Sequence, residues 1–270
     1  MFTKLLAYEI RSRFRADARS FGAFIVTIAV ASGIVAAGLP GISGSTAVLA
    51  YALCALTPVA CAIAAMADYW KTLYGQRGYF TMSLPVSGKV IFWAKNTRIM
   101  IECLLALALA VGGIFAVASA AAWSDGISLA EYTAGPRSLA AGLPTSTVVI
   151  MIVAQVILSL SWLVQGCAVM SIGAEGRFNH MGFGAPIIGF VLLYIVNQVL
   201  STVGTFFVPL SVTTDGHFST EIMWTSYQVA LGTDGHPNVI GIGSYVLVPL
   251  FALVMGLWAS RSIEKHTSLR

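Results

Sequence analysis

Charged residues are scarce in this sequence. Asp, Glu, Lys and Arg together make up 10% of its 270 residues, whereas 57% of the residues are hydrophobic. Soluble domains carry roughly a quarter charged residues, so this composition excludes an ordinary soluble fold. The apolar residues gather in runs of about twenty, which at ~1.5 Å per residue can cross a hydrocarbon layer of ~30 Å. The sequence therefore predicts an all-α integral membrane protein.

Motifs for nucleotide chemistry and catalysis are missing as well. A phosphate-binding loop would need Gly-x-x-x-x-Gly-Lys-Ser/Thr, but Gly88-Lys89 is followed by Val90 and preceded at the first glycine position by Ser83. No histidine falls within an apolar run to serve as base for Ser43, which lies in the short segment Gly41-Ile-Ser-Gly44. We expect no enzyme activity and no cofactor in this chain.

Metal-binding residues are few. The four cysteines all lie in apolar runs, where cysteine is mostly a small packing residue (Cys54, Cys61, Cys103 and Cys167). Thr-Asp-Gly-His occurs twice, at Thr214–His217 and Thr233–His236. Two Asp and two His could hold a metal ion, but Asp-Gly is a common turn dipeptide. A short helix predicted over Ser219–Leu231 would keep the copies apart, so turns are favoured and no metal site is expected.

Six apolar runs define the expected architecture, a single transmembrane domain covering residues 1–270. The expected transmembrane spans are residues 21–39, 46–67, 99–122, 146–171, 183–210 and 239–259. Residues 1–20 are expected to form an amphipathic interfacial helix, because Phe2, Leu6, Ile10 and Phe14 recur at helical spacing beside basic residues. Such a helix lies in the lipid headgroup layer.

Positive charge is sorted by membrane side. Fourteen of the fifteen Lys and Arg residues fall in the N-terminus, residues 68–98, residues 173–181 or the C-terminal tail, and Arg137 alone falls on the other side. By the positive-inside rule, both termini and residues 68–98 are expected in the cytoplasm. The net charge of +4 thus reflects membrane orientation, and no pattern of a nucleic-acid reader accompanies it.

The connection Asp68–Arg98 is longer than a turn between two helices requires. It holds five Lys or Arg residues, many aromatic residues, and helix breakers at Gly75, Gly78 and Pro85. Aromatic residues flanked by arginine are typical of interface anchors, which favours a docking surface for a soluble partner. Alternatively, the aromatic residues lie at the lipid headgroups.

A few polar residues fall within the spans. Glu102 follows Arg98 by four residues, which favours a helical ion pair or a position lining an inner vestibule. Gln155, Asn197 and Gln198 favour hydrogen bonds between helices or a polar translocation path. Both alternatives stay open for each residue.

One stretch carries a family resemblance. It is Tyr74–Ser87 (Tyr-Gly-Gln-Arg-Gly-Tyr-Phe-Thr-Met-Ser-Leu-Pro-Val-Ser), followed by Lys89 and Lys95. Together with the six spans and the N-terminal helix, these residues resemble permease subunits of type-2 ATP-binding-cassette (ABC) exporters. One departure is Gly88, where a larger polar residue is expected.

The resemblance implies a cytoplasmic coupling helix between spans two and three that docks on a separate ATPase subunit, which would bind ATP and Mg. The implied coupling residues are Tyr74, Gly75, Arg77, Gly78, Tyr79, Phe80, Leu84 and Pro85. It further implies a second permease, identical or related, in a bacterial cell membrane, and export of a drug, peptide or lipid-like substrate. The alternatives are a secondary transporter or channel without an ATPase, and a non-transporting immunity or scaffold protein.

Overall fold

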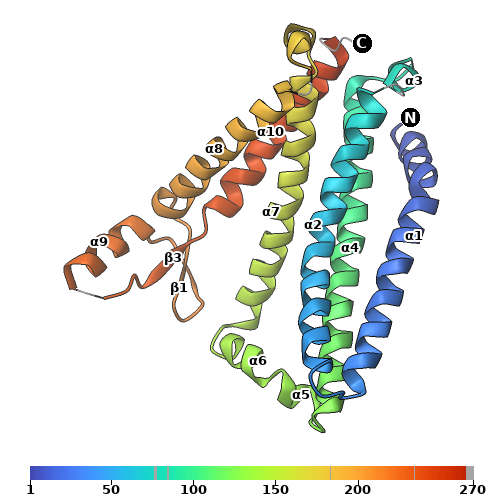
Figure 1. The fold of residues 1–270 in the computed structure, drawn as a ribbon. Helices are drawn as coiled ribbons and strands as arrows, with labels where there is room; N and C mark the ends of the chain where they lie inside the picture. The colour runs from blue at the N-terminus through green and yellow to red at the C-terminus, as the bar shows by residue number, and fades with distance from the viewer. Residues whose placement is uncertain (76–77, 84, 183, 234, 266–270) are drawn as a thin grey trace. The chain divides into compact units, whose positions relative to one another are not determined.

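The computed structural model describes residues 1–75, 78–83, 85–182, 184–233 and 235–265. It is 81% helical. Six helices in the described part are long and apolar enough to cross a membrane (Figure 1): α1 (Phe2–Ala36), α2 (Ser43–Leu73), α4 (Gly88–Ser124), α7 (Thr145–Gly173), α8 (Gly184–Phe207) and α10 (Ser244–Lys265). The expected helical, multi-pass membrane protein is confirmed.

The chain folds as two compact units. Unit 1 comprises Met1–Leu84 and Trp93–Ser138, and unit 2 comprises Pro85–Phe92 and Leu139–Arg270. Short helices connect the long ones: α3 (Gly78–Met82), α5 (Leu129–Tyr132), α6 (Ala134–Ala141) and the 3-10 helix η1 (Gly176–Met181).

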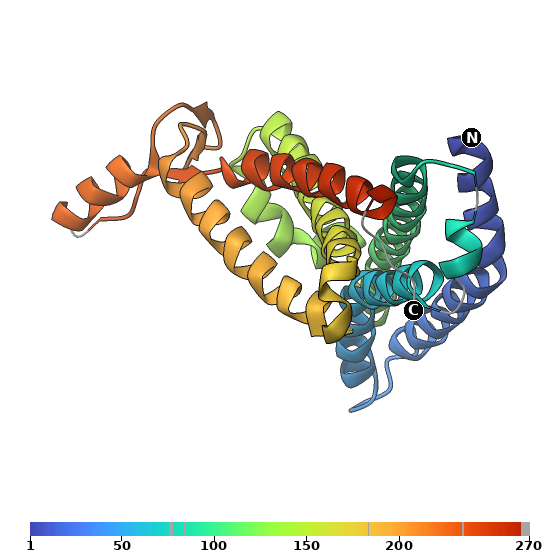
Figure 2. The ribbon, with the colours of Figure 1, turned by 90° about the horizontal axis from the view of Figure 1, so that it is seen from above.

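Unit 1 is built on α1, α2 and α4, which lie side by side (Figures 1 and 2). Ile28 of α1, Ala50 and Cys54 of α2 and Val117 of α4 form one buried cluster. A Cβ on Gly113 of α4 would lie 2.7 Å from the Cys54 Sγ. Small residues let helices approach closely where lipid provides no hydrophobic driving force, so Gly113 fixes the spacing of α4 against α2.

Helix α1 is continuous from the expected interfacial segment into the expected first span. Its 35 residues correspond to about 52 Å at 1.5 Å per residue, well beyond a ~30 Å hydrocarbon layer. No proline occurs in it, and neither Gly22 nor Gly33 breaks it. Similarly, the 31-residue α2 and the 37-residue α4 exceed what a single crossing needs.

Unit 2 is built on α7, α8 and α10. Glycine again permits close packing: a Cβ on Gly173 would lie 2.8 Å from the Pro186 N, and one on Gly189 would lie 2.6 Å from Val169 Cγ1. Near the ends of the helices, Ser262 Oγ of α10 donates a hydrogen bond to the Ser171 carbonyl of α7 at 3.3 Å. The C-terminal end of α10 therefore lies beside the end of α7 that leads into η1.

A small sheet lies between α8 and α10, where the sequence predicted none. Strands β1 (Ser211–Thr213), β2 (Phe218–Ser219) and β3 (Val239–Gly241) pair antiparallel in the order β2-β1-β3, and α9 (Met223–Thr233) follows β2. The sixth span was predicted to start at residue 239, but this segment is β3 and α10 begins at Ser244. Apolar β-branched residues suit a paired strand as well as a helix, so the apolar run alone could not separate them.

The first Thr-Asp-Gly-His copy is a hairpin turn, as favoured from the sequence. Gly216 has a positive φ of 81°, which glycine adopts readily, and its N–H donates to the Thr213 carbonyl at 2.9 Å. Thr147 Oγ1 donates to the Gly216 carbonyl at 2.6 Å, which ties the turn to α7. Asp234 of the second copy lies outside the described residues. Among those described, no group of three His, Cys, Asp or Glu could hold a metal ion.

Candidate functional site

The Asp68–Arg98 connection begins as a continuation of α2. The backbone N–H of Tyr74, at the C-cap of α2, donates to the Trp70 carbonyl at 2.9 Å. The Tyr74 ring contacts the ring of Trp70, with centroids 5.1 Å apart, and that of Tyr69, with centroids 6.4 Å apart. Aromatic contacts of this kind are worth about 0.5–1.5 kcal/mol beyond the area they bury, so they stabilise the end of α2.

Helix α3 then folds back against α2. A Cβ on Gly75 would lie 2.6 Å from the Lys71 carbonyl oxygen, so only glycine fits at this reversal. The Gly78 N–H donates to the Gly75 carbonyl at 2.8 Å. The buried Thr81 donates from Oγ1 to the Thr72 carbonyl at 3.1 Å. The connection is therefore a folded element with a short helix attached to the end of α2.

The predicted coupling residues have different environments. Gly78 is buried, whereas Tyr79 is 56% exposed and Pro85 is exposed. Arg77 and Leu84 lie outside the described residues, as does the side chain of Phe80. Tyr79 is thus the one described aromatic side chain of α3 that is available to a partner.

Gly88 fills a position where the family resemblance leads one to expect a larger residue. Within unit 2, a Cβ there would lie 2.8 Å from the Ser260 carbonyl oxygen and 2.9 Å from the Glu264 N. Both atoms belong to the backbone of α10 and cannot move aside cheaply. Close packing of the start of α4 on α10 explains the glycine.

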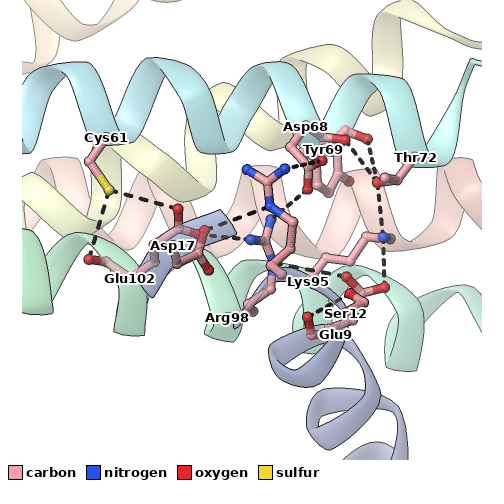
Figure 3. Close-up of polar contacts among 11 residues, drawn as sticks. Glu9, Ser12, Asp17, Cys61, Asp68, Tyr69, Thr72, Lys95, Arg98 and Glu102 are labelled. Carbon is pink, nitrogen blue, oxygen red and sulfur yellow. Dashed lines mark hydrogen bonds and ion pairs between the residues drawn. The ribbon is translucent and has the colours of Figure 1, made fainter. Parts of the chain in front are cut away.

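Seven charged side chains from three helices of unit 1 form what we call the ionic cluster (Figure 3). Its members are Glu9, Arg13 and Asp17 of α1, Asp68 of α2, and Lys95, Arg98 and Glu102 of α4. Lys95 Nζ lies 2.8 Å from Glu9 Oε1 and donates to Thr72 Oγ1 at 3.0 Å. Lys95 therefore links α1, α2 and α4.

Arg98 occupies the centre of the ionic cluster. Its Nη1 lies 2.7 Å from Glu102 Oε2, its Nη2 lies 3.1 Å from Asp68 Oδ2, and its Nε lies 3.9 Å from Glu9 Oε2. The side chain is only 4% exposed. The predicted Arg98–Glu102 pair is confirmed, and the structure adds two further carboxylates to it.

The rim of the ionic cluster involves three more contacts. Arg13 Nη1 lies 3.1 Å from Asp68 Oδ1, and Arg13 Nε lies 3.8 Å from Asp17 Oδ1. Cys61 Sγ lies 3.9 Å from Glu102 Oε1 (Figure 3). Removing one partner of a buried ion pair lowers the free energy of unfolding by roughly 3–5 kcal/mol, since the other charge is left uncompensated. The cluster therefore resists separation of the three helices at this level.

Sequence reasoning assigned no role to Glu9, Asp17 or Lys95 in a site. A signal was present, because Glu9, Arg13 and Asp17 follow one another at intervals of four residues and so share one face of a helix. Ile10 and Phe14 remain exposed, as expected for an apolar stripe in contact with lipid. The polar face of α1 contacts α2 and α4.

Two of the polar residues predicted within the later spans, Gln155 and Asn197, form hydrogen bonds between helices of unit 2. Asn197 Nδ2 donates to Gln165 Oε1 at 2.6 Å, and Gln165 Nε2 donates to the Val248 carbonyl at 3.1 Å. Tyr245 OH donates to Gln155 Oε1 at 2.9 Å. Asn197 is buried and Gln198 is exposed. Glu102 belongs to the ionic cluster of unit 1.

Comparison of the chain with models of protein families, with curated proteins and with solved structures gives no match.

Proposed function

We propose that this chain is the transmembrane permease subunit of an ABC exporter, energised by a separate ATPase subunit that docks on α3. The observation that carries the proposal is the folded α2–α3 connection. Thr81 ties α3 to Thr72, and Thr72 also accepts a hydrogen bond from Lys95 of the ionic cluster. A push on α3 would therefore reach α1, α2 and α4 through direct contacts.

The side chains of α3 suit this role. Tyr79 is exposed on a helix whose other described contacts face α2, and exposed aromatic side chains are enriched at interface hot spots. By the positive-inside rule, the basic residues of this end support a cytoplasmic location for it, where ATP is available. We further propose a second permease, identical or related, a drug, peptide or lipid-like substrate, and a bacterial cell membrane as the location.

Co-purification tests the proposal. The full chain is tagged, expressed in its native host and purified in mild detergent, and the eluate is assayed for ATP hydrolysis and for a nucleotide-binding subunit by mass spectrometry. We expect such a subunit in a fixed ratio to the permease. Tyr79→Glu should abolish its recovery, whereas Trp123→Glu, which changes an aromatic residue 79% exposed at the other end of α4, should not.

Two results would refute the proposal. One is ATP-independent transport by the purified chain in liposomes. The other is equal recovery of the ATPase with Tyr79→Glu and with the unmodified chain. Because Tyr79 is exposed, its replacement should leave the protein folded, which size-exclusion chromatography checks.

A further inference from the structure

Unit 2 contains an apolar cavity of about 410 Å³. Its walls are residues of α7, η1, α8 and α10. The residues that the following argument uses are Arg177 and Phe178 of η1, Leu192 and Val196 of α8, and Met255 and Trp258 of α10. Binding sites for small molecules commonly measure ~300–1,000 Å³ and are mostly apolar. The cavity is therefore large enough for a hydrocarbon ligand.

The dimensions of the cavity match one leaflet of a bilayer. The residues that line it along α8 run from Ala185 to Val196, a distance of about 16 Å at 1.5 Å per residue. This is roughly half of the ~30 Å hydrocarbon thickness. Leu192 and Val196 are themselves 57% and 39% exposed, so the cavity is open on the side of α8. An acyl chain can enter it from the surrounding membrane.

Arg177 lies at one end of the cavity. Arg177 is exposed, its Nε lies 2.7 Å from Glu175 Oε2, and its guanidinium carbon lies 4.7 Å from the centre of the Phe178 ring. The buried Glu175 balances the charge of Arg177, and the Phe178 ring lies against the guanidinium group. A guanidinium group has five N–H donors, so Arg177 can donate to a further acceptor as well as to Glu175.

Helix α10 adds two cations at the same end. Met255 and Trp258 line the cavity, and Arg261 and Lys265 continue their face of the helix at intervals of three and four residues. Both are exposed. Glu264, which is also exposed, lies in the same turn, and its Cβ is 3.1 Å from where a Gly88 Cβ would be. Two cations against one carboxylate leave this turn with a net positive charge.

We propose that this cavity binds an acyl chain of an anionic phospholipid, with the headgroup phosphate held between Arg177 and Arg261. Basic pockets between transmembrane helices on the cytoplasmic side recognise anionic lipid headgroups in this manner. Trp258 lies between the apolar and the charged part, at the level where tryptophan prefers the interface. The inference does not depend on docking of an ATPase.

Native mass spectrometry of the full chain in neutral detergent tests the assignment, with phosphatidylglycerol and phosphatidylcholine of identical acyl chains as probes. We expect one saturable site that prefers phosphatidylglycerol. A cation near the surface contributes ~1 kcal/mol, or about fivefold in affinity. Arg177→Gln and Arg261→Gln should thus each weaken phosphatidylglycerol binding about fivefold. They should weaken phosphatidylcholine binding less, because its choline cation offsets the charge of the phosphate, and Arg137→Gln should change neither.

A second pair of variants tests the cavity itself. Leu192→Trp fills it, whereas Val191→Trp places the same side chain at a neighbouring position that is equally exposed, 56% against 57%, and that does not line it. We expect Leu192→Trp to weaken binding of both lipids more than tenfold and Val191→Trp to weaken neither.

Equal affinity for the two lipids, or equal effects of the two tryptophan variants, would overturn the proposal. So would loss of a dimer in Leu192→Trp with phosphatidylglycerol binding intact, since a second copy of the chain would then be what covers the cavity. Should Leu192→Trp fail to fold, the arginine variants decide, because those side chains are exposed.

Discussion

Removing Lys95 should release the N-terminal part of α1. The Lys95 and Glu9 side chains are 3% and 9% exposed, and their charged atoms are 2.8 Å apart. At an effective dielectric constant of ~20, this separation corresponds to an attraction of about 6 kcal/mol, much of which the desolvation of both ions offsets. Lys95→Met leaves Glu9 with only the Arg98 Nε at 3.9 Å. We expect a loss of about 3–5 kcal/mol in the free energy of unfolding.

The measurement is a double-mutant cycle in detergent micelles. Lys95→Met, Glu9→Gln and the double variant are unfolded reversibly with sodium dodecyl sulfate, and circular dichroism reports the helix content. The double variant has no buried charge left unpaired at this pair, so it should be more stable than the sum of the single losses implies. We expect a coupling energy of at least about 2 kcal/mol. Hydrogen exchange should show faster exchange of the first half of α1 in Lys95→Met.

The control is Arg15→Met, which removes an exposed cation from the same helix and should change stability by less than about 0.5 kcal/mol. Additive single losses, with a coupling energy under about 0.5 kcal/mol, would refute the reasoning. The pair would then contribute nothing beyond two independent polar contacts, and the first half of α1 would be fixed by packing alone.

Two further predictions use the same unfolding titration. Asn197→Leu removes the hydrogen bond to Gln165 Oε1 and should lower the free energy of unfolding by about 0.6–1.7 kcal/mol, the range for hydrogen bonds between membrane helices. Gln198→Leu, at the exposed neighbouring position, should leave it unchanged. Equal losses for the two variants would contradict an interhelical role of Asn197. Gly88→Leu introduces a clash with the α10 backbone and should lower the free energy of unfolding by about 1–3 kcal/mol. Gly112→Leu has open space around its Cβ position and should be tolerated. Tolerance of both variants would mean that α4 does not pack closely on α10 at Gly88.

The parts of the fold that could be predicted from the sequence are those determined within one short segment of the chain. Six apolar runs of sufficient length fix six candidate spans because each helix satisfies its own backbone hydrogen bonds. The Arg98–Glu102 pair was predictable because its two residues are neighbours on one helix. The hairpin at Gly216 was predictable from turn chemistry. Each of these depends on a few adjacent residues.

The parts that were missed depend on residues far apart in the chain. Lys95 and Glu9 are separated by 86 residues, and nothing local to either one identifies the other. Strand β3 was assigned to a span because its apolar residues suit both states, and its pairing with β1 decides between them. The requirement for glycine at position 88 comes from the α10 backbone. Tertiary contacts of this kind do not appear in the local pattern.

A boundary between the two units falls within the connection of α2 and α4. The chain leaves unit 1 at Leu84, contributes Pro85–Phe92 to unit 2 and re-enters unit 1 at Trp93. Helix α3 is tied to α2 on one side of this crossing, and Gly88 packs on α10 on the other. An ATPase docked on α3, as proposed, would therefore act on unit 1 a few residues before the segment Pro85–Phe92 that the chain contributes to unit 2.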